Sequence, residues 1–90
     1  MIKLSAVIIT YNEEEHLEKC LKSLIGITDE IIVVDSFSTD KTSAICEAFN
    51  VSFYQHEFKG YIEQKNYAIS LANYNYILSL DGDEALSETL

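Results

Sequence analysis

The chain has 90 residues and a formal net charge of −9, with six lysines and no arginine. This length allows one folded domain but is short for a complete two-substrate enzyme, so we expect residues 1–90 to be a single domain or a fragment. The negative charge argues against nucleic acid or an anionic membrane surface as a partner, because binding to either depends mostly on basic side chains.

The only early apolar stretch, Leu4–Ile9, is too short to span a membrane. It is followed at once by Glu13, Glu14 and Glu15, so it is neither an anchor nor a secretory signal, and we expect a cytoplasmic protein. Cys20 and Cys46 lack the close spacing of a metal site or a redox motif. We therefore expect both to be reduced core residues.

The apolar pattern predicts strands and helices that alternate along the chain. Nearly continuous apolar runs predict strands at Leu4–Thr10, Ile31–Val34, Val51–Gln55 and Tyr76–Leu80. Helical spacing and start signals predict helices at Glu13–Ile25, from Asp40 to Phe49, and at Ile62–Ala72. For the first helix, Asn12 and Glu15 suggest a capping box, and Gly26 suggests a stop.

The order βαβαβαβ predicts an α/β fold with three layers, in which helices cover both faces of a mostly parallel, Rossmann-like sheet. Ligands of such sheets bind outside the carboxyl ends of the strands, where the strand order reverses. The loops that follow the first, second and fourth strands are therefore the candidate binding loops; they span residues 10–12, 35–38 and 81–84.

The last of these loops holds three carboxylates, Asp81, Asp83 and Glu84, within four positions. Like charges so close together repel each other and require a counter-ion, and oxygen ligands favour Mg²⁺ or Mn²⁺. Gly82 would let the backbone turn so that Asp81 and Asp83 approach one cation. The loop does not fit an EF-hand, because Ala85 stands at the fifth position. The alternative is a solvated turn that caps the next helix.

Polar residues at the other strand ends are weaker candidates. Asp35 could accept a hydrogen bond from a ribose hydroxyl or a base, or it could be a turn residue. Thr10, Tyr11 and Asn12 offer a hydroxyl, an aromatic face and an amide, although Asn12 could simply cap a helix. Glu13 could face the crevice, although glutamates here are more often a solvated first turn.

Lys65 could bring positive charge to a nucleotide, or it could be an ordinary surface lysine. His16 and His56 lack the spacing of metal ligands, and we do not expect either in a site. Neither a nucleophile elbow nor a phosphate-binding glycine-rich loop is present in the sequence. A nucleotidylyltransferase is disfavoured for the same reason, because it needs a glycine-rich signature after the first strand.

Four ordered segments together resemble the N-terminal half of family 2 glycosyltransferases with the GT-A fold. They are VIITYNEEE (Val7–Glu15), IIVVDSFSTDKT (Ile31–Thr42), GYIEQKNYA (Gly60–Ala68) and ILSLDGDE (Ile77–Glu84). The last two segments look most like the branch that adds glucose to the inner core of bacterial lipopolysaccharide.

The resemblance implies that residues 1–90 form the donor part of the domain and bind a UDP-sugar. Thr10 and Tyr11 would contact the uracil, Asp35 would hold the base or ribose, and Lys65 would lie near the nucleotide. Asp81 would reach the ribose and the donor, and Asp83 would bind the metal of the DxD motif. One departure from the family pattern is Ser36, which stands where many relatives carry a second aspartate and implies a weaker or different contact with the base.

The family mechanism is an inverting displacement in which a carboxylate deprotonates the acceptor while the metal stabilises the departing diphosphate. The resemblance places that base downstream of Leu90. We therefore expect no catalytic base in this chain, and we expect the isolated chain to bind donor weakly without transferring it. The acceptor would be a saccharide or a lipid-linked molecule, and the full-length protein could sit at the inner face of the membrane. The alternative is a non-catalytic module that binds a nucleotide or a protein.

Overall fold

The structure is a computed structural model that describes residues 3–82. Its centre is a parallel sheet of four strands in the order β3-β2-β1-β4. The strands are β1 (Leu4–Thr10), β2 (Glu30–Asp35), β3 (Ser52–Gln55) and β4 (Tyr76–Asp81). All three neighbouring pairs run parallel, which confirms the predicted type of sheet.

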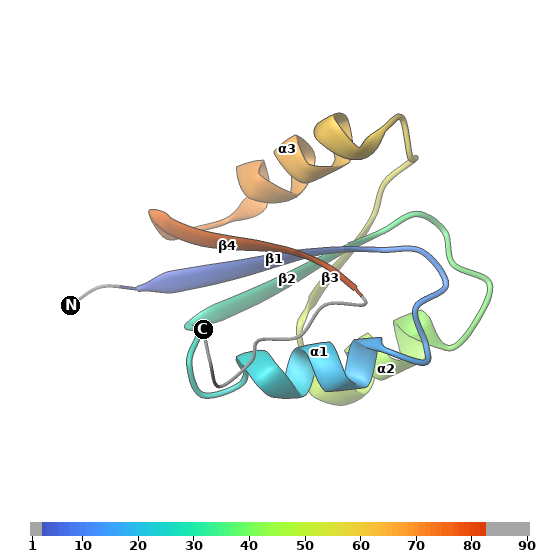
Figure 1. Ribbon diagram of the computed structural model, residues 1–90, viewed down its shortest axis with the longest axis horizontal. Helices are drawn as coiled ribbons and strands as arrows, with labels where there is room; N and C mark the ends of the chain where they lie inside the picture. The colour runs from blue at the N-terminus through green and yellow to red at the C-terminus, as the bar shows by residue number, and fades with distance from the viewer. Residues whose placement is uncertain (1–2, 83–90) are drawn as a thin grey trace.

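The helices are α1 (Leu17–Leu24), α2 (Thr42–Phe49) and α3 (Tyr61–Leu71). Figure 1 shows α1 and α2 together on one face of the sheet and α3 on the opposite face. The predicted three-layer arrangement is therefore confirmed. The chain moves outward from β1 to β3 and then crosses to the other side of β1, so the strand order reverses between β1 and β4.

The alternation of side chains along the two central strands explains their continuous apolar sequences. In β1, Ala6 and Ile8 pack under α1, while Val7 and Ile9 face α3. In β2, Val33 belongs to the first cluster, and its neighbours belong to the second. A strand covered on both faces has no solvent side on which a polar residue could be placed.

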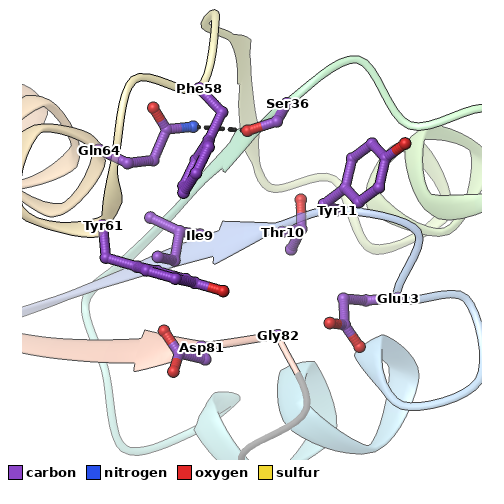
Figure 2. A pocket seen from close by; sticks show the side chains of 10 residues that line it. All are labelled: Ile9, Thr10, Tyr11, Glu13, Ser36, Phe58, Tyr61, Gln64, Asp81 and Gly82. Carbon is purple, nitrogen blue, oxygen red and sulfur yellow. Dashed lines mark hydrogen bonds between the residues drawn. The ribbon is translucent and has the colours of Figure 1, made fainter.

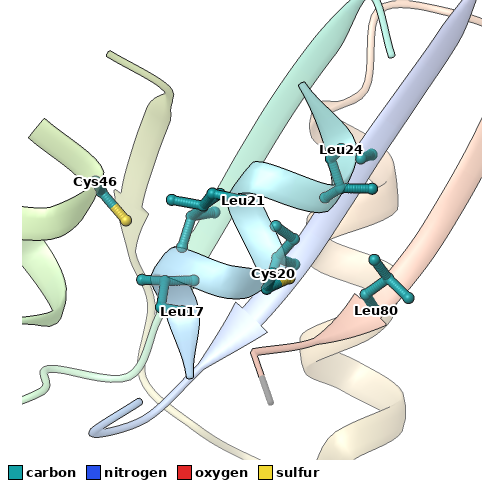
Figure 3. Close-up of a cluster of buried hydrophobic side chains, with 9 residues drawn as sticks. Leu17, Cys20, Leu21, Leu24, Cys46 and Leu80 are labelled. Atoms are coloured by element: carbon teal, nitrogen blue, oxygen red, sulfur yellow. The ribbon is translucent and has the colours of Figure 1, made fainter. Parts of the chain in front are cut away.

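The larger cluster is built on α1, whose apolar stripe is buried as its helical spacing predicts (Figure 3). The fully buried residues of the stripe are Leu17, Cys20, Leu21 and Leu24. Cys46 of α2 and Leu80 of β4 complete the contact between the helical layer and the sheet. Both cysteines are free and buried, as expected.

The capping box predicted for the first helix is wrong. Helix α1 begins at Leu17 rather than at Glu13, and its N-cap residue, His16, makes no side-chain capping bond. Asn12 has a positive φ of 49°, and its side-chain oxygen accepts a hydrogen bond from the Thr39 amide instead. The side chain of Asn12 therefore bonds a neighbouring loop instead of capping the helix, as its local sequence had predicted.

The other predicted helix ends lie close to the observed ones. Gly26, with a φ of 91°, directly follows the C-cap residue of α1 and fits its predicted role as a stop. Asp40 accepts hydrogen bonds from the amide and the hydroxyl of Thr42, the first residue of α2. Within residues 3–82, no helix is both long and apolar enough to cross a membrane.

Truncation of a core leucine tests the packing of α1 on the sheet. We expect Leu21→Ala to lower the free energy of unfolding by about 2–5 kcal/mol, because it leaves a cavity in a fully buried cluster. Lys19→Ala, on the exposed face of the same helix, is the matched control and should change stability by less than about 0.5 kcal/mol. Urea unfolding measures both. Equal effects from the two substitutions would contradict the described core.

The thiol of Cys46 provides a second test of burial. Burial, with a further contribution from the negative charge of Asp35, raises the pKa of this thiol to about 12. Because only the thiolate reacts readily, Cys46 should resist a disulfide reagent at pH 8 in the folded protein. It should react in urea, where the chain is unfolded. Rapid reaction of the folded Cys20→Ala variant would contradict this assignment.

Candidate functional site

A pocket of about 500 Å³ opens at the carboxyl ends of β1 and β4, where the strand order reverses. This is the position at which parallel α/β sheets bind ligands, and the volume suits a small molecule. Figure 2 shows the side chains that surround it. The lining residues are Ile9, Thr10, Tyr11, Glu13, Ser36, Phe58, Tyr61, Gln64, Asp81 and Gly82.

The floor of the pocket is fixed by a buried hydrogen bond between the ends of the two central strands. Thr10 Oγ1 donates to Asp35 Oδ1 at 2.7 Å, and the two residues are partners in the sheet register. The same carboxylate accepts hydrogen bonds from the amide and the hydroxyl of Ser38, at 2.8 and 2.5 Å. Asp35 has no exposed surface and does not line the pocket. In this conformation it therefore positions Thr10 and the loop after β2 without reaching the pocket itself.

Asn12 ties the two neighbouring binding loops together. Its backbone amide donates to Ser38 Oγ at 2.7 Å, and its side chain accepts from the Thr39 amide at 2.9 Å. The Glu13 amide donates to Thr42 Oγ1 at 3.1 Å, which adds a third link. Asn12 does not line the pocket, so the structure gives it a supporting place beside Tyr11 and Glu13, which do.

The acidic side of the pocket is formed by Asp81, at the end of β4, and by Glu13 from the loop after β1. The ammonium nitrogen of Lys65 lies 3.6 Å from Asp81 Oδ1. Both side chains are about two-fifths exposed, so solvent weakens this ion pair. Lys65 therefore lies at the predicted site, although next to Asp81 rather than in the pocket lining.

Gly82 is needed for space at the end of β4. Its predicted role in letting Asp81 and Asp83 approach one cation stays a prediction, because Asp83 lies outside the described residues. A Cβ at Gly82 would lie 2.9 Å from Thr10 Cγ2 and 2.9 Å from Glu13 Cγ. The Gly82 amide donates to the Ile9 carbonyl at 3.0 Å and extends the pairing of β4 with β1. The missing side chain lets the acidic loop pass close to the end of β1.

Three exposed aromatic side chains stand around the pocket. Tyr11 was expected from the sequence, but Phe58 and Tyr61 were not. Phe58 and Tyr61 form an edge-to-face pair with ring centroids 5.1 Å apart. Phe58 and Tyr61 flank Gly60 in a stretch whose apolar residues follow no clear period. Aromatic residues in such a stretch were a signal that they could contact a ligand instead of the core.

A polar relay behind the pocket was also missed by the sequence analysis. Gln64 is 1% exposed, and its Nε2 donates to Ser36 Oγ at 3.0 Å. Its Oε1 lies 2.9 Å from His56 Nδ1, and the His56 ring stacks on Tyr67 at 3.9 Å. No local motif marks His56, because its partner comes from the following helix. The sequence carried no clear signal for Gln64, because the apolar residues of α3 show little helical periodicity.

The donor set at the acidic side fits a hard divalent cation. Asp81 and Glu13 supply carboxylate oxygens to one pocket, and oxygen ligands are the ones that Mg²⁺ and Mn²⁺ prefer. Asp83 and Glu84, which the sequence analysis also assigned to this cluster, lie outside the described residues. Within residues 3–82, no group of three or more histidine, cysteine, aspartate or glutamate side chains is arranged to hold a metal.

The fold and the pocket define an α/β domain that binds its ligand at the point where the order of the parallel strands reverses. Residues 5–90 match the family described as glycosyl transferase family 2, and the chain belongs to that family. The predicted resemblance is therefore confirmed, and the four-stranded sheet with its helices is the Rossmann-like part of the GT-A fold.

Two bacterial relatives illustrate the similarity in sequence. The chain is 43% identical over 88 residues to an uncharacterised glycosyltransferase of Rickettsia bellii, covering 98% of this chain and 30% of that protein. It is 36% identical over 94 residues to LpsC of Rhizobium meliloti, a lipopolysaccharide core biosynthesis glycosyltransferase, covering 99% of this chain and 34% of that protein. The chain thus spans about a third of the length of these relatives.

Solved structures agree with the fold. Staphylococcus aureus TarS, residues 1–349, superposes with a TM-score of 0.83 at 30% identity, covering 97% of this chain and 29% of that chain. The same protein in complex with UDP-GlcNAc superposes with a TM-score of 0.79 at 26% identity, covering 97% of this chain and 28% of that chain.

The close approach at Gly82 gives a direct test of the site geometry. We expect Gly82→Ala to lower the free energy of unfolding by about 1–3 kcal/mol, because the new methyl group overlaps Thr10 and Glu13. Thr10→Ser removes one of the overlapping atoms and keeps the hydroxyl that bonds Asp35. The double variant should therefore recover part of the loss, measured as a positive coupling in a urea-unfolding cycle. Strict additivity would show that the two residues do not touch.

Proposed function

We propose that this chain is the donor-binding part of a family 2 glycosyltransferase that binds a UDP-sugar together with a divalent cation for inverting sugar transfer. The observation that carries the proposal is the pocket between the ends of β1 and β4, which combines exposed aromatic rings with carboxylates. The rings offer stacking faces for a base, and the carboxylates offer ligands for a cation that also binds a diphosphate.

Within this proposal, Tyr11 stacks on the uracil. Thr10 Oγ1, whose proton is donated to Asp35, accepts a hydrogen bond at the base of the pocket. Asp35 acts through Thr10, because its carboxylate is buried behind that side chain. Gly82 lets the acidic loop pass close to Thr10 and Glu13 at the end of β1, which keeps these residues at one pocket.

Asp81, Asp83 and Glu13 form the acidic end of the proposed site. Asp81 and Asp83 would hold Mg²⁺ or Mn²⁺, and the cation would supply positive charge to the diphosphate of the donor. Lys65 adds positive charge beside Asp81 and is close enough to turn toward a phosphate oxygen. We assign the base that deprotonates the acceptor to none of the described residues.

We further propose that the whole protein acts in the synthesis of a cell-envelope polysaccharide or lipopolysaccharide. The similarity to LpsC of Rhizobium meliloti supports this branch of the family. The acceptor would then be a saccharide or a lipid-linked saccharide.

A titration with UDP and Mg²⁺, followed by amide chemical shifts, tests the donor site. We expect shifts confined to the loops after β1, β2 and β4, and a UDP affinity that falls at least about tenfold when Mg²⁺ is removed. Asp81→Asn should abolish most of this metal dependence, because it removes a charged oxygen ligand. Glu47→Gln, on the exposed side of α2, is the matched control and should leave the affinity unchanged.

A UDP response that is indifferent to metal, or no response at all, would instead support the non-catalytic module. Sustained metal-dependent transfer by residues 1–90 alone would contradict the assignment of the base to another part of the protein.

A further inference from the structure

The Ser36 hydroxyl lines the pocket and is held by contacts with two other segments. It follows Asp35 directly, and its amide donates to the Thr10 carbonyl at 3.0 Å. Its Oγ accepts a hydrogen bond from Gln64 Nε2. Figure 2 shows Ser36 between Phe58 and Tyr11, with this hydrogen bond drawn.

The bond from Gln64 determines what Ser36 can offer to a ligand. A hydroxyl has one proton to donate, and here its oxygen already accepts one hydrogen bond. No second hydrogen bond of this hydroxyl is found within residues 3–82. Its own proton is therefore available to a carbonyl oxygen in the pocket. A carboxylate at the same position could only accept.

His56 holds Gln64 in the orientation that this arrangement requires. The Gln64 oxygen faces His56 Nδ1 at 2.9 Å, so a neutral His56 must carry its proton on Nδ1. Stacking on Tyr67 fixes the imidazole ring. With its oxygen held by His56, the Gln64 amide presents its nitrogen to Ser36. A fully buried glutamine thus orients one hydroxyl of the pocket.

The ends of the pocket suggest which part of a nucleotide Ser36 meets. Asp81 and Glu13 place two carboxylates at one end of the pocket. Under the proposed function, this end takes the cation and the diphosphate. Ser36 lies instead beside the rings of Tyr11 and Phe58, which can stack on a base. A pyrimidine base such as uracil carries carbonyl oxygens on its edge, and these accept a hydrogen bond from a hydroxyl.

We propose that the Ser36 hydroxyl, positioned by Gln64 and His56, binds the base of the donor nucleotide by donating a hydrogen bond to a base carbonyl. The inference rests on the proposed function, since it assumes that a nucleotide occupies the pocket. It assigns Ser36 as a residue that recognises the base, and Gln64 and His56 as positioning residues.

Calorimetric binding of UDP and of inorganic pyrophosphate, both with Mg²⁺, tests the proposal. Ser36→Ala should weaken UDP binding roughly 3- to 10-fold, the usual value of one hydrogen bond, and leave pyrophosphate binding unchanged. Ser36→Thr keeps the hydroxyl and should bind UDP within about twofold of the unsubstituted protein. Unchanged UDP affinity in Ser36→Ala, or equal losses for both ligands, would overturn the proposal.

Gln64→Met tests the positioning role at nearly constant side-chain volume. It should weaken UDP binding by a smaller factor than Ser36→Ala, again without an effect on pyrophosphate, and it should add nothing in the double variant. The ¹⁵N spectrum of His56 should show the Nδ1–H tautomer in the unsubstituted protein and lose it in Gln64→Met. If Gln64→Met fails to fold, the comparison of Ser36→Ala with Ser36→Thr still decides whether Ser36 binds the base.

The two proposals fail in different ways. If the unsubstituted protein binds no UDP, the proposed function fails and this inference fails with it. If UDP binds with metal dependence but is insensitive to Ser36, the donor site stands and only the role of Ser36 is overturned.

Discussion

The buried hydrogen bond from Thr10 to Asp35 joins the ends of β1 and β2, and the binding loops are built around it. A carboxylate without solvent must be satisfied by the protein, since an unpaired buried charge costs several kcal/mol. Asp35 meets this demand with Thr10 and Ser38. Ser38 in turn receives the amide of Asn12, so the loops after the two strands form one connected unit.

This network also separates the roles of two adjacent residues. Asp35 is the last residue of β2 and turns inward beneath the pocket, whereas Ser36 lines it. The carboxylate of Asp35 therefore holds the binding loops together, and the neutral hydroxyl of Ser36 faces the pocket. The carboxylates that do line the pocket, Asp81 and Glu13, lie on its other side, where the negative charge has Lys65 nearby.

Local sequence predicted the framework well because burial on both faces leaves a strong pattern. Strand β1 begins and ends where its apolar run does, and the stripe of α1 is buried as its spacing indicates. The start of α1 was predicted four residues early, because the side chain of Asn12 is engaged by Thr39 on a neighbouring loop. Local propensity carries no information about such a partner, which lies 27 residues away.

The sequence by itself determined the order of strands and helices, the parallel sheet, and the loops that carry the polar residues, because these depend on hydrophobic period and on local turn chemistry. It also placed Thr10, Tyr11, Glu13 and Asp81 at strand ends that the structure brings to one pocket. Only the tertiary structure decided that Asp35 is buried, that Gly82 is required for space, and that Phe58 and Gln64 reach the site. Those outcomes depend on contacts between distant segments: Asp35 with Thr10, Gly82 with Thr10 and Glu13, and α3 with β1 and β2. Such contacts leave no periodic signal in the chain.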